Sequence, residues 1–221
     1  EFANINLSYF NAAGEEQVVY CPESSHASAT QKPQRKSLSS EDNVEELAAD
    51  GQPSGKKEIP PVDIESVIAN HENEQVEFKS TLQWDMKKDE KATWLRDQVI
   101  KTICAFLNSV GGTLLIGVSD EGEVLGLQSD LKLMNGKTEE KQKDNFALLI
   151  NNLVNEQLGV VFSRCVKLSF HDIDEKTIAV IRVKPGPEAA FVNNDEFFIR
   201  SGNQTRRLSM ADSMRYIQTH W

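Results

Sequence analysis

Three acidic residues and one lysine have the types and the spacing needed for chemistry on a phosphate ester. Glu77 and Lys79 are two positions apart in a predicted strand, so both side chains project to one face. Glu72 comes just before this strand, and Asp120 follows a second predicted strand at 113–118. Carboxylates about 4 Å apart repel by roughly 4 kcal/mol at a protein-like dielectric. Such a group therefore needs a bound cation, a proton or the ammonium of Lys79.

Two interpretations of this acidic group are open at the level of the sequence. Mg²⁺ and Mn²⁺ prefer carboxylate oxygens and can activate water against a phosphodiester. Glu72, Glu77 and Asp120 are therefore candidate metal ligands and, together with Lys79, candidate catalytic residues. The alternative is a solvated acidic helix end followed by a Glu–Lys pair on a strand, which carries no chemistry.

A glycine-rich turn at 108–113 is a candidate phosphate or nucleotide site. Backbone N–H groups around Asn108, Gly111 and Gly112 could hold a phosphate, and ATP would then be the ligand. The alternative is a helix C-cap followed by a strand, since glycine tolerates the left-handed conformation of helix ends. The chain has no Gly-x4-Gly-Lys-Ser/Thr motif. Segment 51–57 superficially resembles one, but the spacing between its glycines is one residue too short. A P-loop ATPase is therefore excluded.

Basic and small polar residues gather near the end of the chain, in segment 200–207. Arginines and small hydrogen-bond donors are suited to a sugar–phosphate backbone, although a solvated strand-to-helix loop would have the same composition. The candidate nucleic-acid-binding residues are Lys79, Arg200, Asn203, Thr205, Arg206 and Arg207.

Two tryptophans, Trp84 and Trp94, flank the charged stretch 87–91. Exposed, such rings could stack on bases. The alternative is that they cover the edge of the core, as large amphipathic rings commonly do.

The net charge is −10, which argues against a uniformly basic protein that coats phosphates. The charge is unevenly distributed, however. Residues 1–65 carry 12 acids and 5 bases, a net of −7, and residues 66–221 carry 22 acids and 19 bases, a net of −3. Most of the excess acid therefore lies outside the region that carries the motifs.

The cysteines and the apolar runs indicate the compartment. The chain has 3 cysteines, an odd number, and they lack the spacing of metal ligands. We therefore expect no disulfide framework and a reducing, cytoplasmic location. The longest apolar runs are far shorter than the ~20 residues of a membrane span, and we expect no membrane partner.

The chain divides into three predicted regions. Residues 1–21 have the alternation of a β-hairpin or of a remnant of an upstream domain, which we expect to be missing from this chain. Residues 22–60 are rich in Ser, Pro, Gln, Glu and Lys, a composition that predicts a flexible, partly disordered acidic linker. From 61 to 221 the pattern predicts one α/β domain.

Within this domain, amphipathic stretches predict helices and alternating or continuous apolar runs predict strands. We expect helices at 63–70 and 91–108, after the loop 134–143, and after the N-cap Ser209. We expect strands at 75–79, 113–118, 124–127, 166–170, 177–183 and 196–200. This order predicts a mixed β-sheet with flanking helices.

Taken in order, three segments resemble the Schlafen AlbA-type domain: 72–79, 101–127 and 197–209, with 216–221 as a further match. The resemblance covers roughly residues 64–221 and is greater to the single-copy microbial form than to the animal proteins, which duplicate the domain. It implies an α/β fold with a mixed sheet and a role at nucleic acid. In nuclease-competent relatives three acids bind metal and cleave structured RNA such as tRNA, and they match Glu72, Glu77 and Asp120.

The resulting hypothesis is a nucleic-acid-binding domain that prefers RNA to DNA and carries a Mg²⁺- or Mn²⁺-dependent endoribonuclease site. The charged loop 84–91 is a departure from the family pattern and affects the match to Asp120. A single copy also lacks the second lobe of a basic groove, which a homodimer would supply. The alternatives are a non-catalytic DNA-binding or regulatory module of a larger protein, and an ATP-binding domain.

Overall fold

The computed structural model describes residues 7–10, 16–19 and 63–221. The chain divides into two units, Glu1–Lys56 and Lys57–Trp221. In the first unit, strands β1 (Leu7–Phe10) and β2 (Glu16–Val19) pair antiparallel. The expected linker 22–60 lies outside the described residues.

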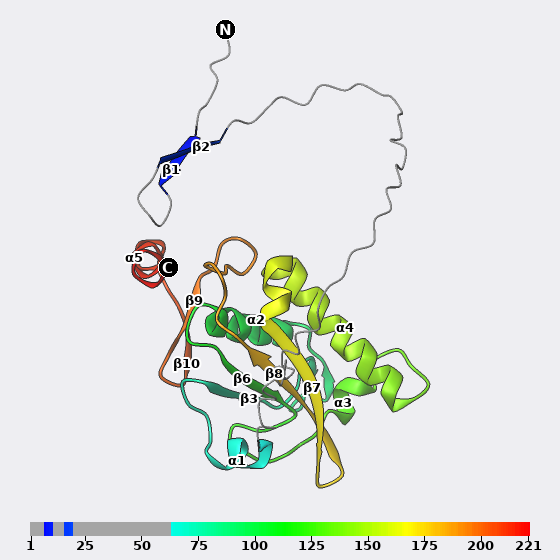
Figure 1. The fold of residues 1–221 in the computed structure, drawn as a ribbon. Coiled ribbons are helices and arrows are strands. Elements are labelled where there is room, and N and C mark those ends of the chain that lie inside the picture. Colours follow the sequence, from blue (N-terminus) through cyan, green and yellow to red (C-terminus); the bar gives the residue numbers. More distant parts are fainter. Residues whose placement is uncertain (1–6, 11–15, 20–62) are drawn as a thin grey trace, which may run out of the picture. The chain divides into compact units, whose positions relative to one another are not determined.

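The second unit is built on a four-stranded sheet in the order β3-β6-β8-β7 (Figure 1). The strands are β3 (Val76–Lys79), β6 (Gly112–Ile116), β8 (Lys176–Val183) and β7 (Val166–Ile173). β3 and β6 run parallel, whereas β6–β8 and β8–β7 are antiparallel. The mixed sheet with flanking helices that the sequence predicts is confirmed.

The central strands β6 and β8 are buried on both faces, because their successive side chains point to opposite sides and an apolar cluster covers each side. Leu114 and Ile116 of β6 enter a large cluster with helices α2 (Trp94–Leu107) and α4 (Glu139–Gln157). Leu115, between them, enters a smaller cluster with α1 (Ile64–Ala69). The apolar runs of β6 and β8 are therefore continuous rather than alternating, as in strands covered on both faces.

Two short helices join these parts along the chain. α3 (Gln128–Leu131) precedes α4, and a 3-10 helix, η1 (Val160–Cys165), leads from α4 into β7. The turn from β7 to β8 has two residues, Asp174 and Glu175, with φ of 49° and 62°. Positive φ at both positions is the geometry that matches the twist of a β-hairpin.

The C-terminal part is a hairpin followed by a helix. β9 (Phe198–Ser201) and β10 (Gln204–Arg207) pair antiparallel, and α5 spans Met210–His220. The Ser209 side chain accepts a hydrogen bond from the N–H of Asp212, so this residue caps α5 as predicted. The hydroxyl of Tyr216 donates to the carbonyl of Asn108 at 2.8 Å and ties α5 to the end of α2.

Several predicted boundaries are wrong. The helix expected from residue 91 begins at Trp94, because the preceding residues form a small hairpin, β4 (Trp84–Asp85) and β5 (Glu90–Lys91). The helix expected after 143 begins at Glu139, since the Thr138 side chain caps its first turn. Segment 200–207, for which a solvated loop was one of two interpretations, contains β10 (Gln204–Arg207).

The strand expected at 124–127 is also not formed. Val124 makes one isolated bridge with Val118, and the chain then turns at Gly126, whose φ is +84°. A left-handed residue at this position interrupts a strand, and glycine adopts it without a steric cost.

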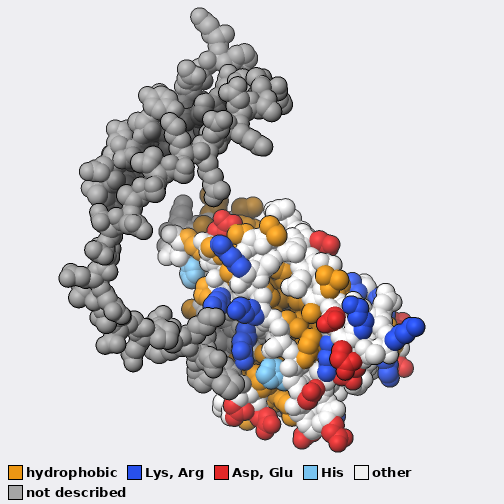
Figure 2. Space-filling view, turned by 45° about the vertical axis from the view of Figure 1, so that its right-hand side comes forward, with side chains coloured by type: hydrophobic (Ala, Val, Ile, Leu, Met, Phe, Trp, Pro, Cys, Tyr) orange, Lys and Arg blue, Asp and Glu red, His pale blue; other side chains and the backbone are white. Residues whose placement is uncertain are grey.

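Charge on the surface of the second unit is uneven. Figure 2 shows Lys and Arg side chains in two groups on the face drawn, the right-hand one mixed with Asp and Glu, and further Asp and Glu side chains along the lower edge. Local groups of charge therefore determine what this surface attracts, more than the net charge. Among the described residues, no helix combines the length and hydropathy that a membrane crossing requires.

Candidate functional site

The parallel pair β3–β6 brings the predicted site residues to one edge of the sheet. The carbonyl of Lys79, at the end of β3, accepts the N–H of Gly117 at 2.8 Å and that of Val118 at 3.3 Å. The turn carrying Asp120 follows immediately. Parallel strands end at the same edge, so Lys79 and Asp120 line one groove although they are distant in sequence.

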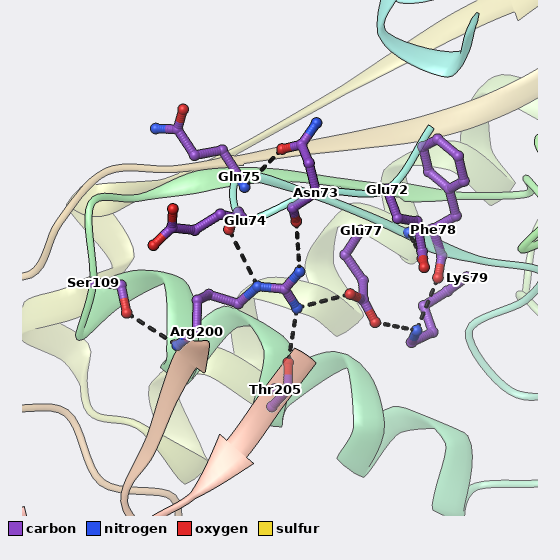
Figure 3. Close-up of polar contacts among 10 residues, drawn as sticks. All are labelled: Glu72, Asn73, Glu74, Gln75, Glu77, Phe78, Lys79, Ser109, Arg200 and Thr205. Atoms are coloured by element: carbon purple, nitrogen blue, oxygen red, sulfur yellow. Dashed lines mark hydrogen bonds and ion pairs between the residues drawn. The ribbon is translucent and has the colours of Figure 1, made fainter. Parts of the chain in front are cut away.

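Glu77 is held between two cations (Figure 3). Its Oε1 lies 2.5 Å from Nζ of Lys79 and its Oε2 lies 2.7 Å from Nη1 of Arg200. Glu77 is buried. Because both carboxylate oxygens have a cationic partner at short distance, the charge of Glu77 is compensated within the fold.

The second partner, Arg200, is a structural residue and not a surface cation. Its side chain has an exposed fraction of 0%. Besides Glu77, the guanidinium donates to the carbonyls of Asn73 and Glu74 at 2.8 and 3.2 Å and to the hydroxyl of Thr205 at 3.1 Å. It also lies 5.0 Å from the ring centre of Phe106. The expectation that Arg200 contacts phosphate is corrected, because its donors are used inside the fold and its side chain is closed to solvent.

Glu72 lies beside this ion pair and completes the acidic group. Its Oε1 accepts the N–H of Phe78 at 2.8 Å. Burial raises the pKa of Glu72, the hydrogen bond from Phe78 opposes this rise, and the negative charges of Glu77 and Asp120 add to it. Glu77 and Asp120 are thus both close enough to Glu72 to act on its charge.

The acidic group does not fit a divalent cation in this arrangement. Carboxylate oxygens are the donors that Mg²⁺ prefers, but both oxygens of Glu77 face cations and one oxygen of Glu72 holds a backbone N–H. Within residues 63–221, no three His, Cys, Asp or Glu side chains converge as metal ligands would. We therefore derive no reaction step through a metal.

The glycine-rich turn closes the end of α2 against the sheet and the β9–β10 hairpin. The buried amide of Asn108 donates to the carbonyls of Ala190 and Phe198 at 2.8 and 2.9 Å and accepts the N–H of Ala190. The N–H of Gly111 is bonded to the carbonyl of Phe106, and a Cβ on Gly112 would lie 2.3 Å from the Phe106 ring. These groups serve packing and the helix end. Asn108, Gly111 and Gly112 therefore form no open pocket for a phosphate, and the structure does not support this interpretation.

The remaining predicted residues lie on the β9–β10 hairpin. Asn203 is in its exposed turn, and Thr205 accepts a hydrogen bond from Arg200. Arg207 pairs with Glu196 at 2.8 Å. Arg206 is exposed and forms no ion pair with any residue that the structure describes. Arg206 is therefore the arginine of this segment that is open to a ligand.

Two residues that the sequence analysis missed shape the groove. Asp130 is fully buried, and its carboxylate accepts the N–H groups of Leu82 and Gln83 at 2.8 and 2.9 Å. Burial raises the pKa of Asp130, and the two hydrogen bonds oppose this rise. The buried side chain of Gln83 in turn accepts Nε of Arg96 at 2.9 Å. No local pattern in the sequence marks these residues, because their partners come from other elements.

The comparison with known proteins identifies the family. The model described as Schlafen, AlbA_2 matches residues 72–209. The chain belongs to this family. The Schlafen AlbA_2 match begins at Glu72, the first residue of the acidic group, and ends at the α5 cap. Membership points to a function connected with nucleic acid.

One similar solved structure is that of the DIP2311 protein from Corynebacterium diphtheriae. Its sequence is 16% identical, and its TM-score is 0.48. The match covers 71% of this chain and 31% of that one, so the chain spans under a third of that protein's length.

Proposed function

We propose that the domain binds nucleic acid, with RNA preferred, along the groove at the carboxyl ends of β3 and β6. The observation that carries this proposal is the ammonium of Lys79. It has three N–H groups, of which one is directed to Glu77 and one to the carbonyl of Phe78. The third is left for a ligand. The Lys79 side chain is 26% exposed and lines the groove.

One further cation supports a phosphate path in this groove. Lys87 lines the groove and is exposed. Arg206 is also exposed, but it alternates along β10 with Thr205, the cross-strand partner of Arg200, so its side chain lies on the opposite face of the hairpin from Glu77. Lys79 and Lys87 form a modest site, so we expect a modest salt dependence, with a slope of log K against log salt of about −1.4 for a single strand.

The preference for RNA over DNA comes from the family resemblance, and cleavage is not part of the proposal. A catalytic role in metal-dependent hydrolysis would need Glu77 to leave its two cations. The same groove in a non-catalytic DNA-binding module would bind DNA at least as tightly as RNA, which separates the two alternatives.

The test is a titration of labelled RNA and DNA single strands of about twelve nucleotides over a range of salt concentrations. We expect Lys79→Gln and Lys87→Gln each to weaken binding and to reduce the salt slope by about 0.7. Lys141→Gln, which removes an equal charge from the exposed face of α4, is the matched control and should bind as the unaltered protein. Binding that none of these variants changes would contradict the proposed site.

A second arm of the experiment adds Mn²⁺ to labelled tRNA. We expect the RNA to stay intact. Cleavage that is lost in a folded Glu77→Gln variant would contradict the structural role given to Glu77 and would support the endoribonuclease activity that the resemblance implies.

A further inference from the structure

The groove beside Lys79 and Asp120 has a wall that the phosphate path does not use. The groove has a volume of about 360 Å³, within the range of small-ligand sites. Two tryptophans and a methionine line it: Trp84, Trp94 and Met86. Trp94 is 55% exposed and Met86 is 53% exposed. Large apolar side chains so open to water, gathered at one groove, mark a binding surface more often than a packing defect.

This wall is preformed. The loop that enters it is fixed by the buried carboxylate of Asp130, which accepts the N–H groups of Leu82 and Gln83. Thr81 donates its hydroxyl to the carbonyl of Trp84 at 2.6 Å. A binding surface that is already ordered loses little conformational entropy when a ligand binds.

The hairpin tip and the helix start set the other sides of the groove. The side chain of Asp85 accepts the N–H groups of Lys87 and Lys88 at 2.9 and 3.1 Å, which shapes the β4–β5 turn. Trp94 is the first residue of α2, so its backbone is fixed by that helix while its ring remains exposed. Lys79 and Lys87 therefore bring positive charge to this aromatic surface, and Asp85 and Asp120 line the same groove.

We infer that this groove holds an unpaired nucleobase, stacked against Trp94, while Lys79 and Lys87 contact the flanking phosphates. An aromatic platform with cations beside it is an arrangement that binds single-stranded nucleic acid, since every base presents a π-face and every nucleotide a phosphate. A base inside a duplex is already stacked on both sides and cannot enter. The inference rests on the proposed function and adds that the ligand must present an unpaired base.

The experiment compares one single-stranded RNA with the same sequence in a blunt duplex. We expect the protein to prefer the single strand. Trp94→Ala should weaken single-strand binding about tenfold and leave duplex binding unchanged, whereas Trp94→Phe should retain most of the affinity. The matched control is Trp221→Ala, because Trp221 is a 44% exposed tryptophan outside the groove. Thermal unfolding of each variant verifies that the fold is kept.

The outcomes separate the two proposals. If the unaltered protein binds RNA but Trp94→Ala binds the single strand equally well, the stacking site is wrong and the proposed function stands. The stacking site is equally wrong if Trp94→Ala and Trp221→Ala weaken binding alike. If the unaltered protein binds neither form, both the proposed function and the stacking site are overturned.

Discussion

Arg200 lies at the predicted site, but its role there differs from the predicted one. Its type and position suggested a phosphate contact, but its guanidinium is closed to solvent and donates to Glu77 and to two backbone carbonyls. A buried cation of this kind stabilises a fold only if its acceptors are complete. The residue thus positions Glu77 and, through it, Lys79.

Removal of Arg200 should therefore be costly. We expect Arg200→Ala to lower the free energy of unfolding by about 3–5 kcal/mol, because Glu77 is left as a buried carboxylate with one partner fewer. Denaturant unfolding measures this. Arg215→Ala removes an arginine from an exposed pair with Asp212 and should cost less than about 1 kcal/mol. Equal stability of Arg200→Ala and the unaltered protein would contradict the structural role.

Glu72 predicts a pH dependence with a definite sign. Burial raises its pKa above the ordinary 4.5, so the folded state binds the proton more tightly than the unfolded state. The stabilisation from this group is complete below pH 4.5 and is lost as the pH rises through the raised pKa. Glu72→Gln has no proton to lose and so gains no buried charge as the pH rises. Its stability relative to the unaltered protein should therefore improve as the pH rises above 4.5.

Asp63 provides the control of opposite sign. The Ser66 hydroxyl and N–H lower the pKa of Asp63 below its ordinary value of 3.8. The stabilisation from this group is therefore present above pH 3.8 and is lost as the pH falls through the lowered pKa. Asp63→Asn should therefore lose stability relative to the unaltered protein as the pH rises. Parallel pH profiles for the two variants would count against this explanation of Glu72.

At the scale of elements, the loop before β4 depends on one buried side chain. Asp130→Asn replaces a carboxylate that accepts two N–H groups with an amide that accepts at one atom and donates at the other. One buried N–H then faces another donor, and we expect a loss of about 1–3 kcal/mol in the free energy of unfolding. Single-strand binding should weaken as well, since this loop leads directly into Trp84 at the start of β4.

The matched change is Asp174→Asn, in the exposed turn between β7 and β8. Asp174 has a φ of 49°, which asparagine adopts readily, and we expect no measurable change in stability. A similar loss of stability in both variants would show that the hydrogen bonds of Asp130 do not contribute specifically to the free energy of unfolding.

Sequence patterns predicted elements better than their ends. The amphipathic stripe of α2, the apolar runs of β6 and β8 and the Ser209 cap of α5 follow from local periodicity, and the structure has them. The short hairpin β4–β5 and strand β10 were missed. These elements are exposed and charged, so they lack the apolar alternation that identifies a half-buried strand.

At the scale of the whole molecule, the sequence placed the acids together but could not show what compensates them. Proximity of Lys79 and Asp120 follows from two parallel strands, which are recognisable from pattern and family. The roles of Asp130 and Arg200 depend on partners 48 and 123 positions away along the chain. Such contacts are decided by tertiary packing, and no spacing rule reports them. The net charge was equally uninformative, because the local groups act separately.

The ion pair between Glu77 and Arg200 also bears on how the chain is made. The two residues are 123 positions apart. At a synthesis rate of about 5–20 residues per second, β3 leaves the ribosome on the order of ten seconds before β9. The Glu77–Arg200 contact forms late, because the chain between the two residues must lose conformational entropy before the contact can stabilise it. A nascent chain that stops short of β9 has the carboxylate without its guanidinium, so the site is among the last parts of the domain to exist.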